Sequence, residues 1–243
     1  MLSLCRTIKM QSMETTKYGA LSLGEIVAKD FRAASLFSEA GIDFCCGGKK
    51  TLQQACAEKS LNPEGFELAL NELQQQIIAP SQDFNNWNLG FLADYIVNTH
   101  HKYVLKTLPD LVFYTQKIAN VHGDHHPELG EVAALFSRVN MELLQHLEKE
   151  EEVLFPAIKL ALKGDASEAR ATIASEIARM SGEHEFAGGA IDRIAVLTNG
   201  YRQPEDACST YSVTLKLLKQ FEEDLHIHVH LENNILYPKA LSL

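Results

Sequence analysis

The sequence is poor in the features that mark several special classes of protein. Only 5 of its 243 residues are cysteine. This small, odd number does not suit a disulfide scaffold, so we expect reduced thiols. Lysine and arginine total 22 against 32 aspartates and glutamates, which gives a net charge of -10. Because such a chain repels phosphate backbones, we expect no nucleic-acid partner.

Long apolar runs are missing as well. No stretch approaches the roughly 18 consecutive apolar residues of a membrane-spanning helix. The N-terminal segment also lacks the apolar core of a secretory signal. We therefore expect a cytoplasmic protein that has no membrane partner. With 46% hydrophobic and 22% charged residues, the composition is that of a folded globular protein.

Helical patterns divide the chain into two unequal parts. Residues 1–17 show no period, and we expect a disordered tail to which we assign no role. Residues 18–77 contain short helical pieces and predict a small helical domain, followed by a linker at 78–88 that is rich in polar residues and contains proline. Residues 89–243 predict an all-α, up-down four-helix bundle. Its helices are expected at about 89–121, 128–162, 167–198 and 205–236, with Pro109 kinking or breaking the first.

Histidines and glutamates occupy positions of these helices where the helical period predicts apolar core residues. The second and fourth helices each carry a histidine and a glutamate at four-residue spacing. On the second helix the same stripe continues through Val153 and Ala157. The first and third helices each add one inward histidine. The six residues are His101, His146, Glu150, His184, His228 and Glu232.

Residues of antiparallel helices lie at the same height when equal numbers of residues separate them from the turn that joins the helices. By this count, most of the six groups lie at a similar height in the bundle. Two buried carboxylates repel each other and are costly to desolvate, so the layer requires cations. Histidine and carboxylate ligands without cysteine favour iron over manganese or zinc. We predict two non-haem irons, each bound by two histidines, with Glu150 and Glu232 bridging them beside an oxo or hydroxo bridge. An open position would suit small diatomic ligands or release of the metal.

The remaining histidines are predicted to lie outside this layer. His122 falls on the stripe of the first helix, but 21 residues of helical rise would place it about 31 Å from His101. The others lie near loops or off the stripes, and we interpret them as surface residues or as partners of the ligands. They are His100, His125, His126, His226 and His230.

Cys45 and Cys46 stand next to each other before two glycines. Such a loop can present sulfur to a partner or a metal, whereas a disulfide between neighbouring cysteines would be strained. A glycine-capped turn with one buried cysteine is the alternative interpretation. Cys5, Cys56 and Cys208 lack partners at metal-ligand spacing and receive no role.

Four segments together give the chain a family resemblance. They are ASLFSEAGIDFCCGGKKTL, HLEKEEEVLFP, GEHEFAG and HVHLENNILYP. Over about residues 18–240 the sequence resembles the iron-sulfur cluster repair di-iron proteins, also called the RIC family, close to the YtfE type. The resemblance implies a hemerythrin-like bundle with a di-iron centre on the same six residues. It also implies a role in restoring clusters damaged by nitric oxide or peroxide. The N-terminal extension to about Lys17 departs from the family pattern.

Three functions remain open at this point. The first is a repair protein that donates iron, in which Cys45 and Cys46 assist transfer or docking to damaged iron-sulfur proteins or cluster scaffold proteins. The second is a carrier or sensor of oxygen or nitric oxide, and the third is a di-iron reductase of nitric oxide, nitrite or oxygen. The cysteine-pair domain favours repair, because a simple carrier does not need it. Whether the protein is an enzyme, and whether it forms a homodimer, stays open.

Overall fold

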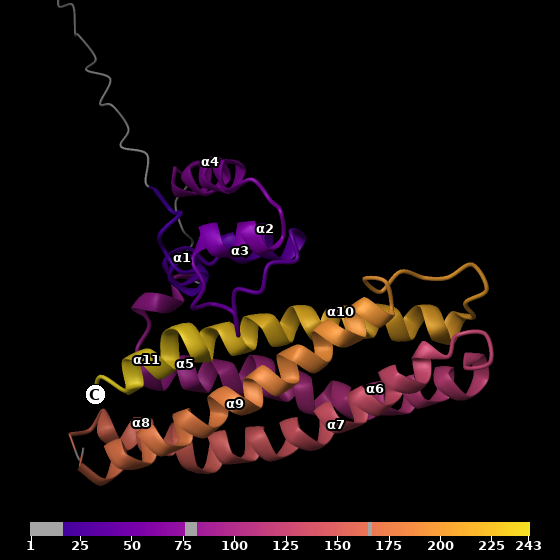
Figure 1. The fold of residues 1–243 in the computed structure, drawn as a ribbon. Coiled ribbons are helices and arrows are strands. Elements are labelled where there is room, and N and C mark those ends of the chain that lie inside the picture. The colour runs from indigo at the N-terminus through magenta and orange to yellow at the C-terminus, as the bar shows by residue number, and fades with distance from the viewer. Residues whose placement is uncertain (1–16, 76–81, 165–166) are drawn as a thin grey trace, which may run out of the picture.

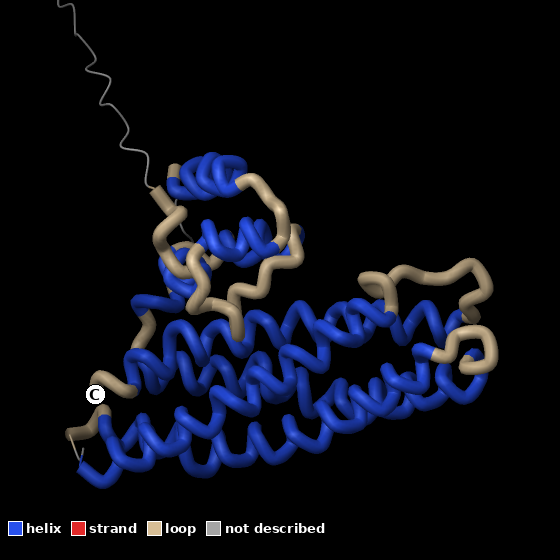
Figure 2. Tube along the Cα trace, viewed as in Figure 1, coloured by secondary structure: helices blue, strands red, loops and turns tan. Residues whose placement is uncertain are grey.

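The computed structural model describes residues 17–75, 82–164 and 167–243. Positions 1–16 of the predicted tail and 78–81 of the predicted linker lie outside this part of the chain. Within the described ranges the chain is helical and contains no β-strand, only an isolated bridge between Ser22 and Thr51 (Figure 2). The predicted all-α fold is therefore confirmed. Among the described helices, none combines the length and apolar character needed to cross a membrane.

The small domain is built from short helices with clear start signals. Ser22 forms a capping box with Glu25, and Thr51 forms one with Gln54, so two helices begin with satisfied backbone donors. A third helix begins at the predicted Asn62 cap, with proline at its first position. The helices are α1 (Leu23–Lys29), α2 (Ala33–Glu39), α3 (Leu52–Glu58) and α4 (Pro63–Gln74).

Four long helical rods make up the bundle, and the small domain lies against one side of it, near α10 and α11 (Figure 1). A short 3-10 turn, Phe84–Asn86, precedes the first rod. In chain order the rods are α5 (Leu89–Ile96) with α6 (Lys102–His122), α7 (Glu128–Lys149) with α8 (Phe155–Ala161), α9 (Ser167–Leu197), and α10 (Ser209–His230) with α11 (Tyr237–Ala240). The fourth rod was expected from residue 205 but begins at Ser209. Pro109 lies inside α6 and does not break it.

Three of the four rods contain a π-helical segment. These are Val97–His101, Glu150–Leu154 and Leu231–Leu236. A π-helical turn holds one residue more than an α-helical hydrogen-bonded turn, so it moves the buried stripe by one position. Val153 was predicted to be buried but is 38% exposed, and its neighbour Leu154 is 0% exposed. The prediction for Val153 is wrong because a constant helical period cannot include this shift.

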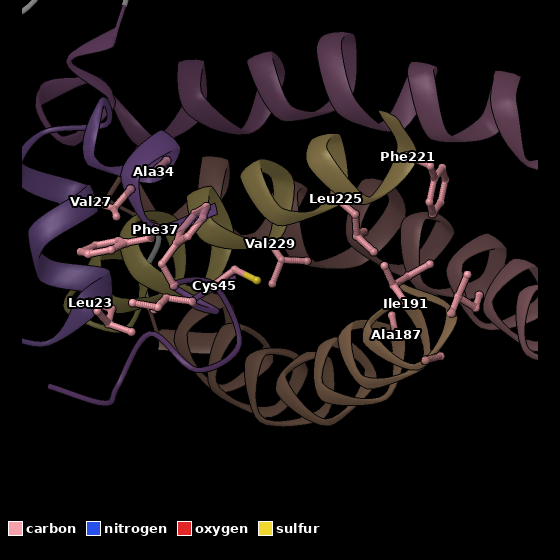
Figure 3. Packing of buried hydrophobic residues seen from close by; sticks show 14 of the residues in the cluster. Leu23, Val27, Ala34, Phe37, Cys45, Ala187, Ile191, Phe221, Leu225 and Val229 are labelled. Atoms are coloured by element: carbon pink, nitrogen blue, oxygen red, sulfur yellow. The ribbon is translucent and has the colours of Figure 1, made fainter. Parts of the chain in front are cut away.

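The small domain and the bundle share one hydrophobic core. Phe37 and Phe44 of the small domain belong to the same cluster of buried side chains as Ile191 of α9 and Val229 of α10. Figure 3 shows Cys45 directed toward Val229 across this boundary. Phe31 of the small domain packs against a second cluster that includes Phe84 and side chains of the bundle, and the ring centroids of Phe31 and Phe84 are 5.0 Å apart. The two parts of the chain are therefore packed as one unit.

Candidate metal centre

The six predicted polar residues meet in one layer inside the bundle. Each of them is at most 2% exposed. Three of them lie in the π-helical segments, where His101 ends the first segment, Glu150 begins the second and Glu232 is the second residue of the third. The π segments are thus the local backbone feature that brings these side chains into the layer.

The six residues form two groups of four that share both carboxylates. One group is His101, Glu150, His228 and Glu232, and the other is His146, Glu150, His184 and Glu232. Within each group the potential ligand atoms all lie within 4.8 Å of one another. Contacts between histidine and carboxylate include His228 Nε2 to Glu232 Oε1 at 2.9 Å and His146 Nε2 to Glu150 Oε2 at 3.3 Å. Two cations could therefore share Glu150 and Glu232.

Polar side chains outside the layer fix three of the four imidazole rings. His101 Nδ1 lies 2.8 Å from Glu151 Oε1, His146 Nδ1 lies 2.8 Å from Glu183 Oε2, and His184 Nδ1 lies 3.0 Å from Asn233 Oδ1. These contacts leave Nε2 of each ring facing the layer, as in metal sites whose histidines are held from behind. Tyr237 donates a hydrogen bond to Glu150 in the same way.

These outer partners were not found by sequence reasoning. Glu183 and Asn233 stand beside His184 and Glu232 in the chain, and Glu151 follows Glu150. A polar residue directly beside a ligand candidate in the sequence could have indicated these partners. The prediction considered only residues on the buried stripe of each helix, and the neighbour of a stripe residue points in a different direction.

Electrostatics show that the layer requires positive charge. Burial acts to lower the pKa of His101 and His146, but the carboxylates of Glu150 and Glu232 outweigh it and raise both pKa values to about 10. Burial and the charge of Glu232 act to raise the pKa of Glu150, and the histidines outweigh them and hold it at about 2. Metal cations would supply this charge in place of protons on the imidazoles.

Several buried atoms of the layer fit metal ligands better than hydrogen-bonding groups. His101 Nε2 and the Oε2 atoms of Glu150 and Glu232 are shielded from solvent and make no hydrogen bond of normal geometry. The Nε2 atoms of His146 and His184 face each other at 3.0 Å. Converging nitrogen and oxygen lone pairs without a sulfur ligand suit iron. The residues present therefore fit the metal that the sequence predicts.

The cysteine loop lies directly against the bundle beside this layer. Asp43 accepts hydrogen bonds from the backbone amides of Cys45, Cys46 and Gly47, which fixes the loop. Cys45 is buried, and both its hydrogen bond with Cys46 and its burial raise the pKa of its thiol. The thiol of Cys46 donates to the backbone carbonyl of His184 at 3.4 Å. The loop is therefore more than an exposed turn.

The other histidines divide into two kinds. His125 is exposed, as predicted, and His122 lies near the far end of α6, with its Nε2 3.2 Å from Cys208 Sγ. His100 is buried and stacks on His228, with ring centroids 5.6 Å apart. His230 is buried as well, against the ring of Phe44. Of the two interpretations, a surface residue or a partner of the ligands, the surface position is excluded for these two, because the small domain and the ligand layer cover them.

Comparison with known proteins adds two domain matches and a set of close relatives. Residues 20–74 match the ScdA_N domain, a domain of unknown function, and residues 92–240 match the hemerythrin HHE cation binding domain. A protein of Pectobacterium atrosepticum named iron-sulfur cluster repair protein YtfE is 38% identical, over 92% of this chain and 98% of its own length. Proteins of the same name from Pectobacterium carotovorum subsp. carotovorum and Yersinia pseudotuberculosis are 37% and 36% identical, with the same coverage of both chains.

Proposed function

The chain belongs to the family of iron-sulfur cluster repair proteins with a hemerythrin domain, and we propose that it repairs damaged clusters by donating iron from its buried layer. One observation carries this proposal: two groups of histidines and glutamates share Glu150 and Glu232. Shared carboxylates suit a pair of irons, whereas a single iron bound by all six residues would keep no open position.

In this proposal His101 and His228 hold one iron, and His146 and His184 hold the other, with Glu150 and Glu232 between them. Bound iron supplies a Lewis-acidic and redox-active cation. The chain's own residues set its surroundings, since Glu151 and Glu183 orient two of the imidazoles from behind. These contacts keep the ligand nitrogens directed into the layer.

The cysteine loop is positioned to take part in iron transfer. Cys46 touches the backbone of His184, so a sulfur atom stands next to one of the proposed ligands. Cysteine thiolates are the protein ligands of iron in iron-sulfur clusters, so a thiolate of this chain can bind iron and be replaced by a cysteine of the cluster protein. We propose that Cys46 contacts iron as cargo on its way to a damaged iron-sulfur protein, which is the partner. Free cysteines persist in a reducing compartment, and we place the protein in the cytoplasm on that basis.

The test is a transfer experiment with labelled iron. The chain is loaded with 57Fe and mixed with an enzyme whose four-iron cluster has been damaged by nitric oxide, and enzyme activity and Mössbauer spectra are followed together. We expect activity to return as 57Fe appears in the cluster. Cys46→Ser should slow this transfer, whereas Cys208→Ser, which removes an exposed thiol on the loop before α10, should not.

Two other results would contradict the donor function. Recovery of activity without 57Fe in the cluster would indicate that the protein acts on the damaging agent, as a reductase would. Reversible binding of nitric oxide or oxygen without any recovery would indicate a carrier or sensor. Equal transfer rates for wild type and Cys46→Ser would remove the cysteine from the route.

A further inference from the structure

A cleft of about 680 Å³ lies between the small domain and the bundle, away from the buried layer. Its small-domain wall includes Asp43 and Gly47 of the cysteine loop. Its bundle wall includes Asp192 of α9 and Glu222 and His226 of α10. The cleft therefore joins the loop that carries the cysteines to the two helices that contribute His184 and His228.

The three residues on the bundle wall form a cluster of potential metal ligands. Glu222 and His226 are four residues apart, so their side chains share one face of α10. Asp192 reaches the same point from α9. One potential ligand atom from each of the three residues lies within 4.8 Å of the other two. This convergence of two carboxylates and an imidazole comes from two different helices and does not follow from a local charge run.

The negative charge of this cluster is poorly compensated. Burial, together with the charges of Asp192 and Glu223, raises the pKa of Glu222 to about 7. Burial and the charge of Asp43 raise the pKa of Asp192 as well. Among the ion pairs of the described residues, none includes a member of the cluster.

The lysines that line the cleft supply only part of the missing charge. Lys50 pairs with Glu58. Lys219 lies 3.8 Å from Glu223, and its charge lowers the pKa of Glu222 without reversing the rise. Lys59 also lines the cleft, and its charge lowers the pKa of Asp192 without reversing the rise. The exposed carboxylate of Asp192 and the half-buried carboxylate of Glu222 are thus held together without an ion pair to either among the described residues.

A fourth polar group lies beside the cluster. The hydroxyl of Tyr201 lines the cleft, is shielded from solvent and interacts with Glu222. Burial, the charge of Glu222 and its hydrogen bond with Tyr201 raise the pKa of Tyr201. A hydroxyl in this position can donate to a metal-bound carboxylate or to a water molecule on a metal.

We propose that Asp192, Glu222 and His226 bind a divalent first-row transition-metal ion in this cleft, separate from the iron of the buried layer. Mixed nitrogen and oxygen ligands suit Mn²⁺, Fe²⁺ or Zn²⁺. Three protein ligands leave positions for water, and Asp192 is exposed, so the ion exchanges with solvent. This site goes beyond the repair function and does not depend on it.

The experiment uses the iron-loaded protein and Mn²⁺ as the probe. Free Mn²⁺ is measured by its electron paramagnetic resonance signal during a titration, and iron content is measured before and after. We expect wild type to bind one Mn²⁺ per chain without losing iron. Glu222→Gln and Asp192→Asn should each weaken Mn²⁺ binding by at least about tenfold, because each removes a ligand.

Glu223→Gln is the matched control, because Glu223 is exposed and lines the same cleft but lies outside the cluster. It removes the same charge as Glu222→Gln, and its affinity for Mn²⁺ should stay within about threefold of wild type, since salt screens an exposed charge. An equal loss of Mn²⁺ affinity in Glu222→Gln and Glu223→Gln would indicate that the negative charge of the cleft attracts the ion in general and that the three residues do not bind it. No Mn²⁺ binding, or binding matched by loss of iron, would overturn the proposal.

Discussion

Replacing Gly24 with alanine should loosen the contact between the small domain and the bundle. Gly24 lies in α1 and faces Asn234, which belongs to the same π-helical segment as Glu232. A Cβ atom added at Gly24 would lie 2.1 Å from Asn234 Oδ1 and 3.2 Å from the carbonyl oxygen of Gly48. The first distance is far below contact, so the Asn234 side chain has to move.

Moving Asn234 costs more than the steric contact alone. Its amide nitrogen donates to the carbonyl oxygens of Phe44 and Cys45 at 3.3 Å each. Overpacking of a fitted contact costs about 1–3 kcal/mol, and each lost hydrogen bond costs about 1 kcal/mol. Alanine gains about 0.5–1 kcal/mol over glycine in a helix. With both hydrogen bonds lost, we expect Gly24→Ala to lower the free energy of unfolding by about 2–4 kcal/mol in total.

Gly65→Ala is the matched control, because Gly65 lies in α4 and a Cβ there would meet nothing within 4 Å. It should raise the free energy of unfolding by about 0.5–1 kcal/mol. Urea unfolding followed by circular dichroism measures both variants. In the double variant Gly24→Ala with Asn234→Ala, the steric cost should disappear, which a double-mutant cycle detects. If Gly24→Ala is as stable as Gly65→Ala, Asn234 does not hold the small domain against the bundle through its contacts with Gly24, Phe44 and Cys45.

Two further predictions concern the far end of the bundle. Hydrogen bonds from the backbone amide of Tyr211 and from His122 lower the pKa of Cys208 to about 7. More thiolate is then present at neutral pH, so alkylation of Cys208 by iodoacetamide should rise with a midpoint near pH 7; a midpoint near the usual value of about 8.5 would contradict this. His122→Ala should leave the iron content unchanged, because the helix rise places it about 31 Å from His101. Loss of iron in His122→Ala, measured by elemental analysis, would refute the assumed register.

The ligand candidates could be found from the sequence because their positions obey a simple rule. His146 and Glu150 are four residues apart within an apolar stripe, and His228 and Glu232 repeat this arrangement. A polar group at a core position is costly, so its presence in two helices is informative. The structure brings all six candidates into one layer.

The π-helical segments could not be predicted in the same way. Val153 and Leu154 are both apolar, so the hydrophobic pattern does not tell which of the two is buried. Ile235 and Leu236 are also both apolar, and both are buried. The backbone accommodates an extra residue at each segment only because the ligand layer and the surrounding core favour that arrangement. Tertiary packing therefore determines where the buried stripe moves by one residue, and a constant helical period cannot predict that position.

The hydrophobic core that the two domains share could not be predicted from the sequence either. Phe44 and Cys45 have the composition of an internal core of the small domain, yet they pack against His226 and Val229 of α10. Contacts between segments nearly 190 residues apart leave no local pattern, as the bonds from Asn234 to Phe44 and Cys45 illustrate. Such contacts follow from the arrangement of whole helices.

The number of irons per chain and their magnetic coupling test the proposed metal centre most directly. Elemental analysis with Mössbauer spectroscopy of the purified protein should find two irons that are magnetically coupled. Glu150→Ala and Glu232→Ala should each lose the coupled pair, because each carboxylate belongs to both groups of ligands. One iron per chain in wild type, or two coupled irons retained in both variants, would contradict the proposed centre.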